Sequence, residues 1–182
     1  NATRVNDDTN PEAHNQWHPS IWCDKKTGRL FIKWLDTRDV PTSDSCLVYA
    51  TYSDDGGVTF AQNQQVSNKK FRINCTQCGG GGVPAYLGDY DAIGSNGRNA
   101  IMSWTDFRNN NFGSYVAYFP DYAMKTNVTN TSVGSNDSTF ITVSVPAVKL
   151  YNDRVKFTAT LDSLPTSGSL QMSFVNGRDS IT

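Results

Sequence analysis

The feature that most constrains the fold is a short motif that occurs twice. Residues 34–38 and 104–108 share the pattern W-x-D-x-R, and the two copies lie 70 residues apart. A Gly-Arg pair precedes each copy and a tyrosine-rich segment follows it. A duplicated unit predicts a repeat architecture, in which neighbouring units cover faces that neither can bury alone.

The composition indicates that these units are built from strands. Asn, Ser and Thr together account for 52 of the 182 residues, whereas Glu occurs once, at Glu12. Small polar residues favour turns and caps, while the Leu, Ala and Glu that fill helices are scarce. Aromatic residues make up 12% and suit half-buried strands. We therefore predict an all-β fold.

Charge and hydropathy exclude two classes of partner. The net charge of -1 is mixed along the chain and offers no basic surface for nucleic acid. No apolar run approaches the ~20 residues of a membrane span. The chain starts at Asn1 without a Met or an apolar leader, and we expect a processed or excised piece.

Short apolar segments between turn residues predict two sets of strands. The first set is 19–23, 29–35, 46–53 and 59–67, and the second is 90–94, 98–105 and 114–119. An insertion at 68–88, with Cys75, Cys78 and a glycine run, separates them. Because Arg4-Val5-Asn6 is similar to Val66-Ser67-Asn68, we expect the chain to begin on the last strand of a preceding unit.

The most specific motif lies between the third and fourth strands. The sequence fits S-x-D-x-G-x-T-[FW], with Ser53, Asp55, Gly57, Thr59 and Phe60 at its defined positions. We expect Asp55 to accept backbone hydrogen bonds, Gly57 to take a positive φ and Phe60 to fill the core. The motif resembles the Asp-box, or bacterial neuraminidase repeat, of sialidase-like β-propellers.

This resemblance covers about residues 4–123 and implies two propeller-type four-stranded blades. Such blades run roughly 40–50 residues, so the insertion accounts for the longer period. Trp17–Ile21 resembles the opening of a blade, whereas Phe119–Tyr122 departs from the Asp-box expected in the second one. We assign residues 1–123 to this propeller segment.

A second module follows a polar linker at 124–138. The linker holds three acceptor sequons for glycosylation, at Asn127, Asn130 and Asn136. Apolar and polar residues then alternate at 141–145, 155–161 and 170–174, which predicts strands with one buried face. Residues 139–182 resemble part of a bacterial immunoglobulin-like repeat. Three or four strands make an incomplete immunoglobulin-like β-sandwich, because a whole one needs about seven.

The sialidase resemblance also implies an active site, which this chain lacks in part. It requires three arginines, a Tyr/Glu nucleophilic pair and an Asp acid/base. Glu12 has no evident Tyr partner, and Phe71-Arg72-Ile73-Asn74 is similar to the family's F-R-I-P motif without its Pro. We therefore expect no complete glycosidase site here.

The motif acids and arginines have two interpretations. Repetition favours the structural one, in which each Asp and Arg braces the edge of its own blade. In the functional one, propeller geometry gathers six residues on the face opposite the Asp-box, as a site for a glycan or a protein ligand: His18, Asp36, Arg38, Asp89, Asp106 and Arg108.

Metal sites are weakly indicated. The pairs Asp7-Asp8 and Asp89-x-Asp91 offer oxygen ligands for calcium, but neither spans an EF-hand-like loop, which favours solvated turn acids. His14 and His18 lack zinc-site spacing. We expect no other cofactor.

The four cysteines leave the disulfide pattern open. Cys23 and Cys46 fall at opposite ends of antiparallel strands, too far apart for direct bonding. Either Cys75 bonds Cys78 in a local loop, or one of them joins the insertion to Cys46. Both options predict an extracellular, oxidising location.

The combined expectation is a non-catalytic extracellular or cell-surface protein with a structural or adhesive role. Open sheet edges predict a homo-oligomer or polymer, and possible filament growth by β-strand complementation. The alternatives are a fragment of an exo-sialidase-like glycoside hydrolase, or a carbohydrate-binding propeller that uses Trp17, Trp22 or Tyr90 as stacking platforms.

Overall fold

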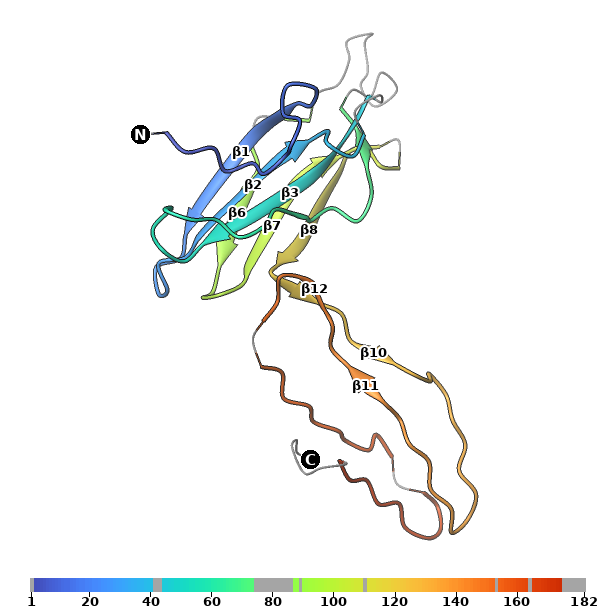
Figure 1. The fold of residues 1–182 in the computed structure, drawn as a ribbon. Coiled ribbons are helices and arrows are strands. Elements are labelled where there is room, and N and C mark those ends of the chain that lie inside the picture. Colours follow the sequence, from blue (N-terminus) through green and yellow to red (C-terminus); the bar gives the residue numbers. More distant parts are fainter. Residues whose placement is uncertain are drawn as a thin grey trace. The chain divides into compact units, whose positions relative to one another are not determined.

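The computed structural model describes residues 2–40, 44–73, 87–88, 90–109, 111–152, 154–163 and 165–174 (Figure 1). These residues form strands and turns and contain no helix, which confirms the all-β class. None of them therefore belongs to an apolar helix that could cross a membrane. The chain divides into two compact units, residues 1–151 and 152–182.

The first sheet follows the predicted strand set. Its strands pair in chain order and antiparallel: β1 (Gln16–Cys23), β2 (Leu30–Asp36), β3 (Ser45–Ser53) and β4 (Gln64–Gln65). A further short strand, β5 (Phe71–Arg72), pairs with β3 at its start. Only the fourth strand differs markedly from its prediction of 59–67, because the turn at Asp54–Thr59 occupies the residues before it.

The second sheet repeats the central part of the first. It contains β6 (Ala92–Ser95), β7 (Ala100–Asp106) and β8 (Gly113–Phe119), paired in that order. Trp104 lies opposite Tyr115, just as Trp34 lies opposite Tyr49 in the first sheet. Among the described residues, no strand pairs with the edge of β8 that faces away from β7. The structure therefore describes three strands in this sheet.

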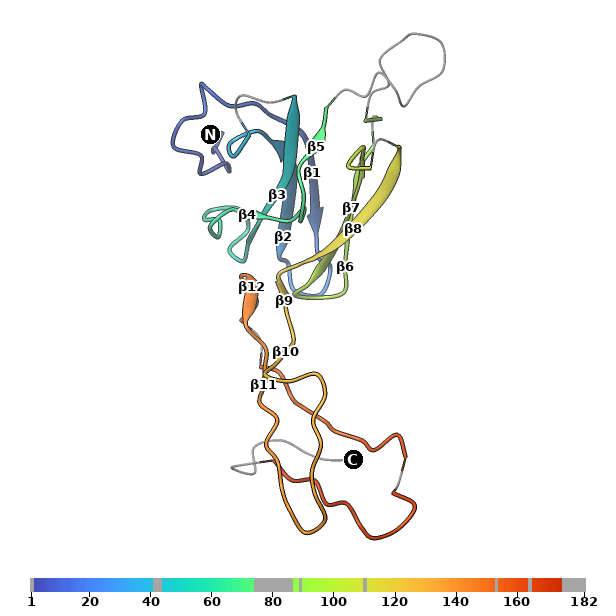
Figure 2. The same ribbon diagram turned by 90° about the vertical axis from the view of Figure 1, so that its right-hand side faces the viewer.

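The two sheets pack face to face, as the two views of the ribbon show (Figures 1 and 2). Side chains from both sheets form one core, and its fully buried members include Phe31, Val48, Met102 and Phe119. Burying each of these large side chains contributes about 1.5–3 kcal/mol, which makes this core the main stabilising element. Alternation along β2 explains how this strand contributes to the core, because every second residue points toward the second sheet.

The opposite face of the first sheet carries a smaller cluster. Trp34, Leu47 and Tyr49 are buried there, and Val5 of the N-terminal segment packs against them. Figure 2 shows this segment on the side of β2 and β3 that faces away from β6–β8. Residues before the first strand thus cover part of a face that no other sheet of the described residues occupies.

Four short strands complete the first unit. They are β9 (Asp121–Tyr122), β10 (Lys125–Thr126), β11 (Val143–Ser144) and β12 (Ala147–Lys149), and they pair as β9 with β12 and β10 with β11. The expected linker at 124–138 thus begins with β10, and its side chains are exposed throughout. The strand expected at 141–145 is present only as the two residues of β11.

In the second unit, described residues 154–163 and 165–174 contain no strand, although alternation predicts two. The expected alternation between buried and exposed side chains is still present: Val155, Phe157 and Ala159 are half-buried, while the residues between them are exposed. A strand requires a hydrogen-bonded neighbour, and the pattern of a single segment does not supply one.

Candidate functional site

In the first copy of the repeated motif, the Trp, Asp and Arg side chains form a hydrogen-bonded cluster at the end of β2. Asp36 is fully buried and accepts hydrogen bonds from the indole Nε1 of Trp34 at 2.8 Å and the backbone amide of Arg38 at 2.8 Å. The guanidinium Nε of Arg38 donates to the same carboxylate at 2.9 Å. That guanidinium also lies over the ring of Tyr49, 4.3 Å from its centroid.

The second copy forms the same hydrogen-bonded cluster at the end of β7. Asp106 is fully buried and accepts from the indole of Trp104 at 3.0 Å and the backbone amide of Arg108 at 3.0 Å. Arg108 Nε donates to it at 2.8 Å, and the guanidinium lies 3.9 Å from the ring centroid of Tyr115. Each repeated position of W-x-D-x-R thus has a defined local partner, which supports the structural interpretation of the motif.

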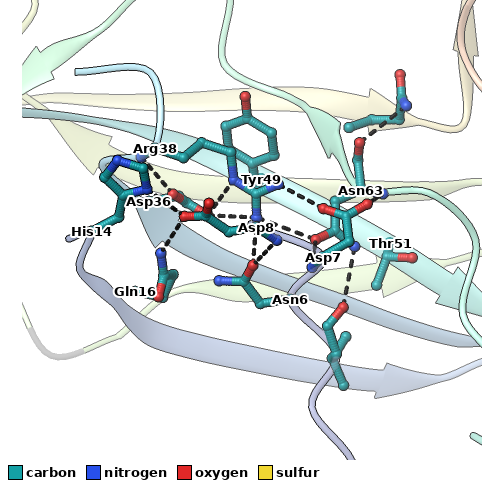
Figure 3. Close-up of polar contacts among 12 residues, drawn as sticks. Asn6, Asp7, Asp8, His14, Gln16, Asp36, Arg38, Tyr49, Thr51 and Asn63 are labelled. Atoms are coloured by element: carbon teal, nitrogen blue, oxygen red, sulfur yellow. Dashed lines mark hydrogen bonds and ion pairs between the residues drawn. The ribbon is translucent and has the colours of Figure 1, made fainter. Parts of the chain in front are cut away.

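Arg38 also ties the N-terminal segment to the first sheet (Figure 3). Its Nη1 donates to Asp7 at 2.6 Å, and its Nη2 donates to Asn6 at 2.9 Å and to Asn63 at 3.2 Å. Asn63 is buried, and its Nδ2 donates to the carbonyl of Val5 at 3.2 Å. A hollow of about 390 Å³ lies between residues 3–7 and 58–63.

Asp8 anchors the other end of this network. It is buried and lies 2.6 Å from His14 Nδ1, and it accepts from Gln16 Nε2 at 3.2 Å and from the Asn10 amide at 2.9 Å. Burial alone raises a carboxyl pKa, but the hydrogen bonds from Asn10 and His14 and the nearby positive charges outweigh it. The pKa of Asp8 is therefore lowered.

The expected calcium ligands at Asp7-Asp8 are engaged in these contacts. Asp7 pairs with Arg38 and also accepts from the amide of Asn63 at 2.9 Å. Asp91 pairs with a lysine, and Asp89 lies outside the described residues. No group of three or more metal-binding side chains occurs in the part of the chain that the structure describes.

The predicted Asp-box turn has the expected hydrogen bonds. Asp55 accepts from the amides of Val58 at 3.0 Å and Thr59 at 2.9 Å, and Gly57 has φ of +92°. The hydrogen bonds from the hydroxyl and amide of Thr59 lower the pKa of Asp55. Phe60 differs from its prediction, because it is half-buried beside Gly57 instead of filling the core.

A buried ion pair that the sequence did not reveal joins the two sheets. Lys33 is 1% exposed, and its Nζ lies 2.8 Å from Asp91 and donates to the carbonyl of Ser103 at 2.7 Å. Burial lowers the pKa of Lys33, while the hydrogen bond and charge of Asp91 oppose that shift. A lysine inside the apolar run of β2 was the available signal, because a buried cation requires a partner.

His18 lies next to this pair. Its Nδ1 is 3.8 Å from Asp91, and its backbone has a φ of +56° at an irregularity in the pairing of β1 with β2. Such a conformation in a non-glycine residue costs on the order of 1–3 kcal/mol. His18, Pro19, Ser20 and Asp91 line a hollow of about 270 Å³. This arrangement places an imidazole and a carboxylate at one small opening.

Four of the six residues of the expected ligand face form two separate ion pairs, and a fifth, His18, lies by a residue outside the set. The sixth, Asp89, lies outside the described residues. Each motif arginine binds the aspartate of its own copy, and His18 lies by Asp91. Trp17 packs against the main core, Trp22 donates to Ser95 at 2.8 Å, and Tyr90 is 91% exposed. Of the expected stacking platforms, Tyr90 presents most of its ring.

The cysteines and sequons take the following positions. Cys23 is an exposed free thiol and Cys46 is a buried one. Both disulfide options involve Cys75 or Cys78 and stay predictions. The Cys46 side chain packs into the apolar core between the sheets. Cys75 and Cys78 lie outside the described residues. The sequon asparagines are all exposed: Asn127, Asn130 and Asn136.

Comparison of the chain with protein-family models, with curated proteins and with solved structures gives no match.

Proposed function

We propose that this chain is a non-catalytic structural or adhesive protein that self-associates through its second sheet. We further propose that residues 1–123 form a segment of a sialidase-like Asp-box propeller, and that residues 139–182 form part of an immunoglobulin-like module. The hydrogen-bonded turn at Asp55 and the hydrogen-bonded clusters of the two W-x-D-x-R copies support the first assignment.

The observation that carries this proposal is an exposed apolar face on β7 and β8. Ile101, Val116 and Tyr118 are 42%, 61% and 57% exposed. The motif period and the strand register align these positions with Phe31, Ala50 and Tyr52 of the first sheet. Phe31 and Ala50 are fully buried because the second sheet covers them. An apolar sheet face of this kind marks an interaction site.

The charged groups support a structural rather than a catalytic role. A sialidase grips its substrate carboxylate with free arginines, whereas Arg38 and Arg108 are held by carboxylates of this chain. Glu12 is exposed and lies in a turn before the first strand. The proposed location is extracellular or at the cell surface, and the exposed sequons of the 124–138 segment are consistent with it.

Sedimentation velocity over a wide concentration range tests self-association. We expect species larger than the 20.1 kDa monomer for the unmodified chain. Val116→Lys should return it to a monomer, because a charge in the contact cannot be desolvated cheaply. Val133→Lys is the matched control, since Val133 is 43% exposed in the polar 124–138 segment, outside the proposed contact. A chain that stays monomeric at every concentration refutes the proposal.

One observation favours glycan binding as a second candidate. Tyr90, with its exposed ring, directly precedes Asp91, which lines the hollow beside His18. An aromatic platform beside polar groups suits a sugar ring, as either a carbohydrate-binding propeller or a fragment of an exo-sialidase-like hydrolase would require. Glycan-array binding that Tyr90→Ala abolishes would support the former, and turnover of a fluorogenic sialoside would support the latter.

A further inference from the structure

A contact between an asparagine and a motif arginine occurs twice in the first unit. Arg38 Nη2 donates to Asn6 at 2.9 Å, and Arg108 Nη1 donates to Asn68 at 2.5 Å. Asn68 follows β4 of the first sheet, and its contact reaches across to the second sheet. Asn6 therefore has the same relation to the first sheet as Asn68 has to the second.

This correspondence assigns a strand position to the N-terminal segment. When Asn6 is aligned with Asn68, Ala2 and Thr3 fall on the two residues of β4. In the first sheet, β4 pairs with β3 at Tyr49 and Ala50. Residues 2–6 thus correspond to the last strand of a sheet that packs on the Trp34 face, where Val5 already lies.

The second sheet presents the edge to which such a strand would add. β8 pairs with β7 along one side, and its other side holds no partner strand within the described residues. Tyr115 and Val116 correspond to the two β3 residues that pair with β4, because Tyr115 opposes Trp104 as Tyr49 opposes Trp34. An unpaired edge beside an apolar face favours strand addition.

The segment and the edge cannot meet within one chain. Both views of the ribbon place the N-terminal segment and β8 on opposite sides of the paired sheets (Figures 1 and 2). The segment is also fixed to its own first sheet by Arg38 and Asn63. If residues 2–6 supply a strand to β8, that strand must therefore come from another molecule.

We propose that residues 2–6 of one copy add to the β8 edge of a second copy, with Ala2 opposite Val116 and Thr3 opposite Tyr115. The exposed face of Ile101, Val116 and Tyr118 in the second copy then packs against the first sheet of the first copy. This repeats between molecules the contact that joins the two sheets within one chain. The inference rests on the proposed self-association and names its partner and register.

Site-directed disulfide formation tests this register. A copy with Ala2→Cys and a separate copy with Val116→Cys are mixed, both in a Cys23→Ser background that removes the exposed native thiol. Directly opposed strand residues have Cβ atoms about 4.5–5.5 Å apart, close enough for a disulfide after small adjustment. The matched control pairs Ala2→Cys with Val133→Cys, because Val133 is exposed in the 124–138 segment, away from the proposed contact.

We expect the mixture to form a species of twice the 20.1 kDa chain mass, with a 2–116 disulfide identified by peptide mass spectrometry. The control should give little of it. Oligomers in sedimentation without this disulfide would overturn strand addition while leaving self-association intact. A monomer in sedimentation would overturn both.

Discussion

Replacement of Asp106 by Asn should destabilise the first unit more than replacement of Asp36 by Asn. Both carboxylates are fully buried and hold equivalent arginines. Without Asp36, Arg38 keeps the carboxylate of Asp7 at 2.6 Å. Without Asp106, Arg108 has no carboxylate among the described residues, and its Nη2, 2.6 Å from Asp106, is buried with no other hydrogen-bond partner there.

The expected magnitudes follow from this difference. Removing one partner of a buried ion pair costs about 3–5 kcal/mol, because the remaining charge is left uncompensated. A cation that retains a second carboxylate loses about 1.5–3 kcal/mol with the hydrogen bond. Asp7 is 43% exposed, so water screens part of its attraction. We expect losses of about 4 kcal/mol for Asp106→Asn and about 2 kcal/mol for Asp36→Asn.

Urea unfolding followed by tryptophan fluorescence measures these losses. All four tryptophans lie in the first unit, so the signal reports on it alone. With a slope of about 2 kcal/mol/M, the midpoints should fall by about 2 M and about 1 M. Adding Arg108→Met to Asp106→Asn removes the stranded cation and should recover part of the loss. Equal midpoints for the two single variants would refute the reasoning.

Three further predictions concern single positions. Hydrogen bonds from a serine hydroxyl and from backbone amides lower the pKa of Asp24, so its contribution is present above the ordinary value of 3.8 and disappears as pH falls through the lower folded-state pKa. The stability difference between the unmodified chain and Asp24→Asn, from urea midpoints, should therefore shrink below about pH 4. Gly57→Ala forces a side chain onto a φ of +92° and should cost about 1 kcal/mol or more in thermal unfolding, whereas Gly134→Ala should change little. Iodoacetamide should modify the exposed Cys23 in the native protein and reach the buried Cys46 only after unfolding, as peptide mass mapping would show.

The local parts of the fold could be predicted from sequence because their causes are local. The hydrogen bonds of the turn at Asp55 join residues within four positions of one another, and the side-chain cluster of the W-x-D-x-R motif spans only Trp34 to Arg38. Turn residues and alternation therefore determine both. The positions of β2, β3, β7 and β8 follow from the same pattern to within one residue or two.

The remaining parts depend on partners distant in the sequence. Lys33 and Asp91 are 58 positions apart, and nothing near Asp91 indicates a buried lysine. Cys46 lies in the core because residues of the second sheet pack against it, and spacing along the chain does not reveal that burial. The apolar residues of 155–161 alternate correctly but lack a neighbouring strand among the described residues. The sequence pattern of one segment therefore predicts which of its own residues are buried, but not which distant residues they contact.

The geometry of the repeated contact also determines what kind of assembly self-association would give. The first sheet uses its Phe31 face to meet the Trp104 face of the second, so the two surfaces in contact are different. A contact between unlike faces is heterologous, and its repetition leaves one unsatisfied face at each end. Such contacts close into a ring or continue as a filament, according to the rotation between neighbours. In the proposed assembly the asparagine–arginine contact recurs at every junction, so it would set that rotation and decide between the two outcomes.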